Sequence, residues 1–134
     1  MKKYTLLFLA LIIVAFGMTG CSKYSSHYNA VLYAHSNDTD SASASFYKFE
    51  GTEVFKLKTE SGKTAKIHYF GKLESGSLTV FYDCGETKTE LFSVQSGDEI
   101  NACSDSLSAD TVYIIIETSE ICESGYFSFE INYD

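Results

Sequence analysis

The residues best suited to covalent chemistry in this chain are its four cysteines: Cys21, Cys84, Cys103 and Cys122. A catalytic cysteine reacts as the thiolate, which electropositive surroundings stabilise. Cys84 and Cys122 instead stand beside acidic residues in the sequence, and nearby negative charge raises a thiol pKa. No two cysteines have the close CxxC spacing of a zinc site. We therefore expect structural cysteines, with a disulfide among the three that follow Cys21.

An oxygen-rich run at 37–41, Asn-Asp-Thr-Asp-Ser, is the candidate for metal binding. Its alternating carboxylates, Asp38 and Asp40, resemble the opening of a calcium loop, although the glycine and final glutamate of an EF-hand are missing. Loops of this composition are also common without any metal. Calcium held by Asp38 and Asp40 is the one cofactor that the sequence suggests, beside the alternative of no cofactor.

The motifs of common hydrolases and nucleotide-binding enzymes are missing: the sequence holds no GxSxG, no HExxH and no glycine-rich phosphate loop. Its histidines, His27, His35 and His68, form no i, i+2 or i, i+4 pair that would suit a metal. The chain is therefore predicted not to be an enzyme. The alternative is an envelope hydrolase whose residues come together only in the fold.

In the segments that position these groups, apolar residues recur at every second position. In 126–133, for example, Phe127 and Phe129 alternate with Tyr126 and Ser128, and the helical period of 3.6 is not seen. Clusters of Gly, Ser, Asn and Asp separate such segments. The pattern predicts an all-β protein, an antiparallel two-sheet sandwich or jelly roll of about eight short strands. The candidate strands are 30–35, 44–50, 52–58, 64–70, 77–83, 90–95, 99–103, 111–117 and 126–133.

Strand direction narrows the choice of disulfide. If the late strands alternate in direction, 77–83 and 99–103 both end at one end of the sandwich, where they deliver Cys84 and Cys103. Cys122 then lies at the opposite end, about 23 Å away for a strand of seven residues. A disulfide tolerates a Cα separation of only about 4.4–6.8 Å. The alternation of strand direction therefore predicts a Cys84–Cys103 bridge.

Three aromatic residues, Phe81, Tyr113 and Tyr126, fall on the strand faces opposite the predicted core. Aromatic rings exposed on a sheet can stack on sugars or contact a protein. These three residues form the candidate binding surface, with the alternative that both sheet faces are partly covered.

The N-terminus has the layout of an export signal: Lys2 and Lys3, an apolar run at 6–16, then Gly20 before Cys21. The run is shorter than the ~20 residues that a membrane span needs. Residues 18–21 resemble the lipobox of bacterial lipoproteins, which implies cleavage before Cys21 and lipidation of its sulfur. The predicted organisation is a signal peptide at 1–20, lipidated cysteine and tether at 21–29, and a β-sandwich domain at 30–134.

Between residues 46 and 131 the chain also resembles a family of small lipoproteins from Gram-positive bacteria. The residues that carry this resemblance are FEGTE at 49–53, LESGSL at 73–78, VFYD at 80–83 and SGYFSF at 124–129. The resemblance implies an extracellular, β-rich domain and no particular activity. The Ser-Gly turns before two late strands are similar to those of jelly-roll domains at the C-termini of secreted peptidases.

The charge of the chain limits its partners. Acidic residues outnumber basic ones, 18 to 10, for a formal net charge of −8, and cleavage before Cys21 would remove two of the lysines. Such a surface repels phosphate backbones, so nucleic acid is not an expected partner. The protein is expected to attach to the membrane through its lipid anchor. We expect a non-enzymatic binding or adaptor module for a protein or carbohydrate ligand on the outer, extracellular face of the cytoplasmic membrane. A purely structural lipoprotein is a further alternative.

Overall fold

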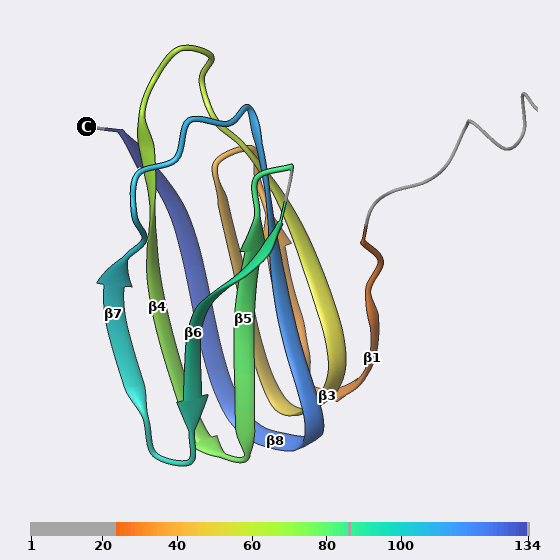
Figure 1. Cartoon of the computed structure of the whole chain (residues 1–134). Coiled ribbons are helices and arrows are strands. Elements are labelled where there is room, and N and C mark those ends of the chain that lie inside the picture. Colours follow the sequence, from red (N-terminus) through yellow and green to blue (C-terminus); the bar gives the residue numbers. More distant parts are fainter. Residues whose placement is uncertain (1–23, 86, 134) are drawn as a thin grey trace, which may run out of the picture.

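The computed structural model describes residues 24–85 and 87–133, which form eight β-strands (Figure 1). The predicted signal peptide and Cys21 lie outside the described residues. Within the described part of the chain, no helix long and apolar enough to cross a membrane is found. The strands are β1 (His27–Val31), β2 (Ala34–Asn37), β3 (Ser41–Lys58), β4 (Ala65–Ser75), β5 (Ser77–Asp83), β6 (Lys88–Gln95), β7 (Glu99–Cys103) and β8 (Thr111–Tyr133).

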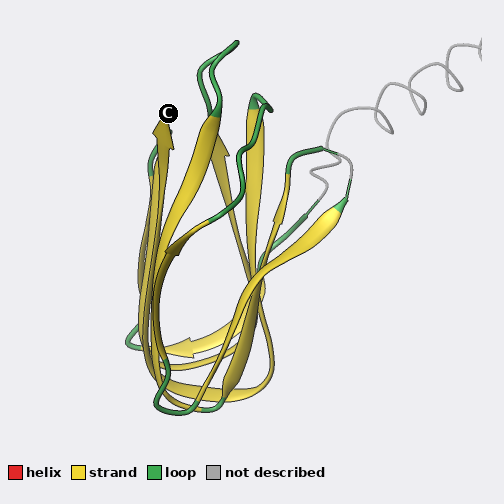
Figure 2. Ribbon diagram, turned by 60° about the vertical axis from the view of Figure 1, so that its left-hand side comes forward, coloured by secondary structure: helices red, strands yellow, loops and turns green. Residues whose placement is uncertain are grey.

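Two long strands, β3 and β8, shape the domain. The segments predicted as separate strands at 44–50 and 52–58 are both part of β3, and 111–117 and 126–133 are both part of β8. The two strands pair antiparallel and bend together, with a register shift between Phe49 and Gly51. Figure 2 shows the bend at the lower end of the domain. The two separate strands predicted on either side of Gly51 imply a turn there. In the structure Gly51 (φ +126°) instead provides a bulge that redirects one continuous strand.

The bend divides one hydrogen-bonded sheet into two facing layers. The wide layer has the order β1 and β2, first half of β3, second half of β8, β4, β7. The narrow layer has the order second half of β3, first half of β8, β5, β6. Every pairing between these strands is antiparallel. The predicted all-β antiparallel sandwich is confirmed, with the difference that its layers belong to one continuous sheet.

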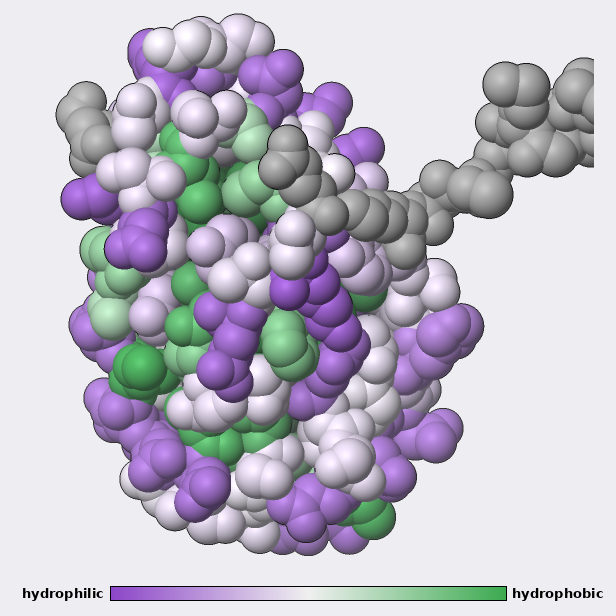
Figure 3. Space-filling view, in the orientation of Figure 1, coloured by the Kyte–Doolittle hydropathy of each residue, from purple (hydrophilic) through white to green (hydrophobic). Residues whose placement is uncertain are grey.

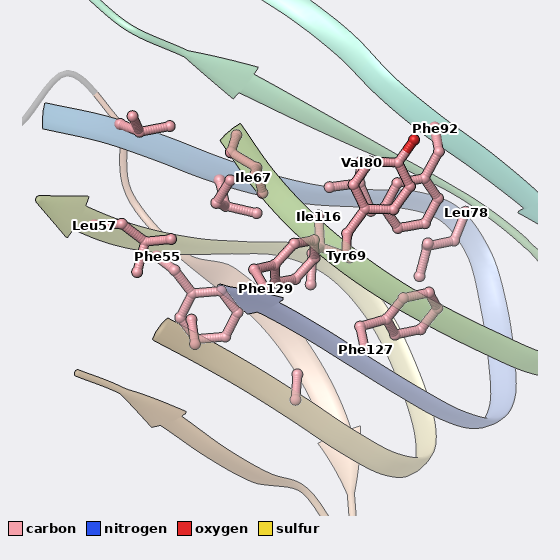
Figure 4. Close-up of a cluster of buried hydrophobic side chains, with 14 of the residues drawn as sticks. Phe55, Leu57, Ile67, Tyr69, Leu78, Val80, Phe92, Ile116, Phe127 and Phe129 are labelled. Carbon is pink, nitrogen blue, oxygen red and sulfur yellow. The ribbon is translucent and has the colours of Figure 1, made fainter. Parts of the chain in front are cut away.

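The core fills the space between the two layers (Figure 4). Phe92 of the narrow layer packs against aromatic rings of the wide layer, with centroid distances of 4.7 Å to Tyr69 and 6.3 Å to both Phe127 and Phe129. Burying an aromatic side chain of this size contributes about 1.5–3 kcal/mol. The alternation predicted for 126–133 is confirmed as far as Ile131, since Phe127, Phe129 and Ile131 are buried and Tyr126 is exposed, whereas Tyr133 at the end of the strand is exposed rather than buried.

The N-terminal edge of the wide layer contains residues that the sequence places in a tether. β1 begins at His27, and the Ser26 hydroxyl donates to Glu53 Oε1 at 2.6 Å. The folded domain therefore begins before the predicted boundary at residue 30. The predicted strand at 30–35 is interrupted, because Leu32 has φ +50° between β1 and β2.

Candidate functional site

Two aromatic side chains stand next to each other on the outer face of the wide layer. Phe70 comes from β4 and Tyr126 from β8, and their ring centroids are 5.9 Å apart at an interplanar angle of 53°. The alternation of β4 buries Ile67 and Tyr69 and leaves Phe70 on the opposite face, half-buried. Tyr126 is 46% exposed. We call this pair the platform.

Polar side chains surround the platform because the register of five strands places them there. Asn101 of β7 is the pairing partner of Phe70, and its Oδ1 lies 2.8 Å from His68 Nε2. Lys72 is the partner of Tyr126. Further across the same layer the Ser36 and Ser43 hydroxyls are 2.8 Å apart. The platform is therefore an apolar centre within a rim of amide, imidazole, ammonium, hydroxyl and carboxylate groups, the carboxylates being those of Glu99 and Glu130.

The outer face of the narrow layer also carries aromatic rings, but other parts of the chain cover them. The Tyr113 ring packs against Tyr24, centroid to centroid 5.5 Å, and the Tyr24 hydroxyl donates to Asp83 Oδ2 at 2.5 Å. That hydrogen bond to Asp83 raises the pKa of Tyr24 to about 12. Figure 3 views the molecule from the side of β5 and β6, where apolar patches are separated by hydrophilic side chains.

A shallow groove of about 320 Å³ on this face has Phe81 in its lining, together with threonine and serine hydroxyls and Glu117. The ammonium of Lys88 lies 4.3 Å from the centroid of the Phe81 ring and pairs with the Glu117 carboxylate. An ion-paired ammonium on the ring competes with any ligand that would stack there. Phe81 is thus less open to a ligand than Tyr126.

The structure separates the three aromatic residues predicted as one binding surface. Phe81 and Tyr113 lie on the outer face of the narrow layer, whereas Tyr126 lies on the outer face of the wide layer beside Phe70. The sequence reasoning did not single out Phe70. The signal was present, because Phe70 alternates with Tyr69, which belongs to the buried face of β4.

A second polar cluster surrounds Glu53, which is 4% exposed at the edge between the layers. Its carboxylate accepts the Ser26 hydroxyl at 2.6 Å, the Tyr33 hydroxyl at 2.5 Å and the Val54 backbone N–H at 3.0 Å. His35 Nδ1 lies 3.4 Å from Glu53 Oε2. Burial, together with the hydrogen bond to Glu53, raises the pKa of Tyr33 above its usual value. The sequence reasoning missed Glu53, although it alternates in phase with Phe55 and Leu57 and so faces inward.

The Glu53 cluster does not have the arrangement of a Ser-His-acid triad. In such a triad the imidazole lies between the hydroxyl and the carboxylate. Here the carboxylate of Glu53 lies in the middle, and Ser26 donates to it directly. Ser25 Oγ does lie 2.8 Å from His27 Nε2, but both residues are exposed. The cluster instead ties the N-terminal segment and the β1–β2 connection to β3.

The three described cysteines, Cys84, Cys103 and Cys122, are free thiols, so the predicted Cys84–Cys103 bridge is not formed. Cys84 follows β5 in the narrow layer, whereas Cys103 ends β7 in the wide layer beside His68. Alternating strand direction places both cysteines at the same end of the sandwich but does not assign β5 and β7 to a layer. Burial raises the pKa of the Cys84 and Cys122 thiols.

The predicted calcium ligands lie in the short connection from β2 to β3, where Asp38 and Asp40 are partners of backbone hydrogen bonds. The Asp38 N–H donates to the Ser41 carbonyl at 2.8 Å, and the Ile131 N–H donates to the Asp40 carbonyl at 2.8 Å. Across residues 24–85 and 87–133, no three His, Cys, Asp or Glu side chains gather in a way that could hold a metal ion.

No family model matches the chain, and no curated protein does. Among solved structures, a CBM4 structure is 14% identical with a TM-score of 0.46, covering 81% of this chain and 79% of its own. The TmCBM61 structure in complex with β-1,4-galactotriose is 11% identical with a TM-score of 0.48, covering 79% and 91%. The pre-peptidase C-terminal domain of a Bacillus anthracis collagenase is 12% identical with a TM-score of 0.44, covering 81% and 88%. Identities this low concern the fold alone.

Proposed function

We propose that this chain is a non-enzymatic carbohydrate-binding domain, held by a lipid on Cys21 at the outer face of the cytoplasmic membrane. The observation that carries the proposal is the Phe70–Tyr126 platform, with its exposed aromatic surface and polar rim. Aromatic rings provide apolar contact area at little cost in side-chain entropy. The apolar C–H faces of a sugar ring fit such a surface, while the rim supplies hydrogen-bond partners for the hydroxyl groups.

The charge of the domain favours a neutral glycan. The chain carries a net charge of −8, so an anionic polymer would meet long-range repulsion. Near the aromatic pair, Lys72 is exposed and can donate, while Asn101 and His68 can donate or accept. This mixture suits hydroxyl groups, which both donate and accept hydrogen bonds.

The test of the carbohydrate proposal is a panel of neutral oligosaccharides, titrated by calorimetry into a soluble chain from Ser22 to Asp134. We expect Tyr126→Ala and Phe70→Ala each to weaken binding about tenfold or more, because a central aromatic contact is worth on the order of 2 kcal/mol. Phe81→Ala is the matched control, since it removes an aromatic ring from the outer face of the other layer. If Phe81→Ala abolishes binding and the platform variants do not, the site lies on the narrow layer. A panel without any binder would favour a structural role.

The anchor is tested separately in cells. Growth with a palmitate analogue is expected to label the wild-type protein, and the label is expected to disappear in Cys21→Ala, because the cysteine sulfur and the new N-terminus would carry the acyl chains. Two or three chains hold a protein firmly where a single chain does not. Cys103→Ala, which removes an exposed thiol of the domain, is the control and keeps its label. Label that persists on Cys21→Ala would place the lipid elsewhere.

A further inference from the structure

Apolar side chains are exposed where β1 ends. Leu32 is 81% exposed, Ile121 55% and Val31 49%. Val31 and Ile121 both line a groove of about 240 Å³, together with Ala30 and Phe49. Tyr28 and Tyr47 are further exposed aromatic residues on β1 and β3. We call Val31, Leu32 and Ile121 the apolar tip.

Leu32 is unfavourable for the isolated domain in two independent ways. Its backbone has φ +50°, a left-handed conformation that suits glycine or asparagine and strains a bulky residue. Its side chain is also the most exposed of the large apolar side chains in the described residues, so it gains little from the core. Strain of this kind can mark a functional position, and asparagine or glycine would serve the fold better.

The position of the chain before β1 indicates what the tip contacts. This step rests on the proposed lipid at Cys21. Only Ser22 and Lys23 lie between Cys21 and Tyr24, and the three Cα–Cα steps from Cys21 to Tyr24 span at most about 11 Å. Tyr24 is fixed to the domain through Asp83 and Tyr113. The lipid would therefore keep the domain close to the bilayer on the side of β1, the outermost strand of its edge (Figure 1).

We propose that the apolar tip inserts into the outer leaflet of the membrane and fixes the orientation of the anchored domain. Leucine, isoleucine and valine favour the acyl boundary, and tyrosines such as Tyr28 and Tyr47 favour the membrane–water interface. Lys48 beside the groove suits the headgroup level. The acidic net charge disfavours anionic headgroups, so the partner is the zwitterionic phospholipid surface. The β1 edge would then face the bilayer, while the outer face of the wide layer, which carries the platform, remains open to the cell exterior.

The chain holds no tryptophan, so a single introduced tryptophan reports on the contact. The full lipidated protein, carrying Leu32→Trp or the control Cys103→Trp on β7, is incorporated into phosphatidylcholine liposomes and recovered by flotation. Replacing the lipid with its brominated form is expected to quench Leu32→Trp to about half its fluorescence, since interfacial side chains lie within the reach of acyl bromines. Cys103→Trp is expected to stay unquenched, because Cys103 is exposed on β7, at the opposite edge of the wide layer from β1.

A second pair of variants separates membrane contact from folding. Val31→Trp serves as the reporter, with Leu32 kept or replaced by asparagine. Leu32→Asn is expected to lower the quenching severalfold while the melting temperature of the domain stays the same or rises. Flotation without quenching of Leu32→Trp would overturn the membrane contact and leave the anchor intact. Failure to float would refute the anchor and the contact together. A third outcome is a blue-shifted tryptophan emission of Leu32→Trp that brominated lipid does not quench. If crosslinking then yields dimers, the apolar tip contacts a second copy of the chain instead of the membrane.

Discussion

Replacing Phe127 with alanine is expected to lower the free energy of unfolding by about 3–5 kcal/mol, the usual cost of truncating a fully buried phenylalanine. Phe127 has no exposed surface, and its ring packs between Phe46 and Phe92 at centroid distances of 6.2 and 6.3 Å. Phe127 thereby contacts β3 in the wide layer and β6 in the narrow layer. Since a small domain has a total stability of about 5–15 kcal/mol, this loss would remove a large share of the free energy that keeps it folded.

The measurement is urea denaturation of the soluble chain, followed by circular dichroism, with Tyr126→Ala as the adjacent control. Tyr126 points to the outer face and is 46% exposed, so its removal is expected to change stability by less than about 1 kcal/mol. If the two substitutions cost the same, the assignment of inner and outer faces in β8 is wrong. A small effect of Tyr126→Ala on stability would also show that its loss of glycan binding does not arise from unfolding.

This pair illustrates what the sequence can predict. Alternation in a strand depends on geometry that every strand shares, so the inward Phe127 and outward Tyr126 follow from the pattern alone. The same rule points Glu53 inward and Phe70 outward. It does not reveal that Glu53 acquires hydroxyl partners, because Ser26 lies in the predicted tether and Tyr33 in the predicted strand at 30–35, and alternation does not say which segments pack together.

The continuity of β3 and β8 could not be predicted, because a bulge and a turn share the same residue types. Gly51 lies at the bend of β3, where an added Cβ would lie 2.2 Å from the His27 carbonyl oxygen. The glycine is needed for this close approach of β1 rather than for a reversal of the chain. The absent disulfide has a related cause, since strand direction says nothing about which layer a strand joins.

Replacing Glu53 with alanine is expected to cost about 3 kcal/mol of stability, because it removes a buried acceptor that two hydroxyl groups now share. The Ser26 and Tyr33 hydroxyls would lose this acceptor, whereas the Val54 N–H would keep the Ser26 hydroxyl oxygen at 2.9 Å. Glu50→Ala, an exposed glutamate on the same strand, is expected to cost less than about 0.5 kcal/mol. Equal effects in urea denaturation would contradict the role of Glu53 as the acceptor that ties down the N-terminal segment.

A double-mutant cycle with Tyr33→Phe identifies the cause of that loss. Tyr33→Phe alone is expected to cost about 1 kcal/mol, since the carboxylate keeps its other donors. In the Glu53→Ala background the same change is expected to cost nothing or to stabilise, because it removes a hydroxyl that no longer has its acceptor. The double variant should therefore be more stable than the sum of the single effects by about 1–2 kcal/mol. Strict additivity would mean that the 2.5 Å contact between Tyr33 and Glu53 contributes nothing, and that only the lost packing of Glu53 destabilises the edge.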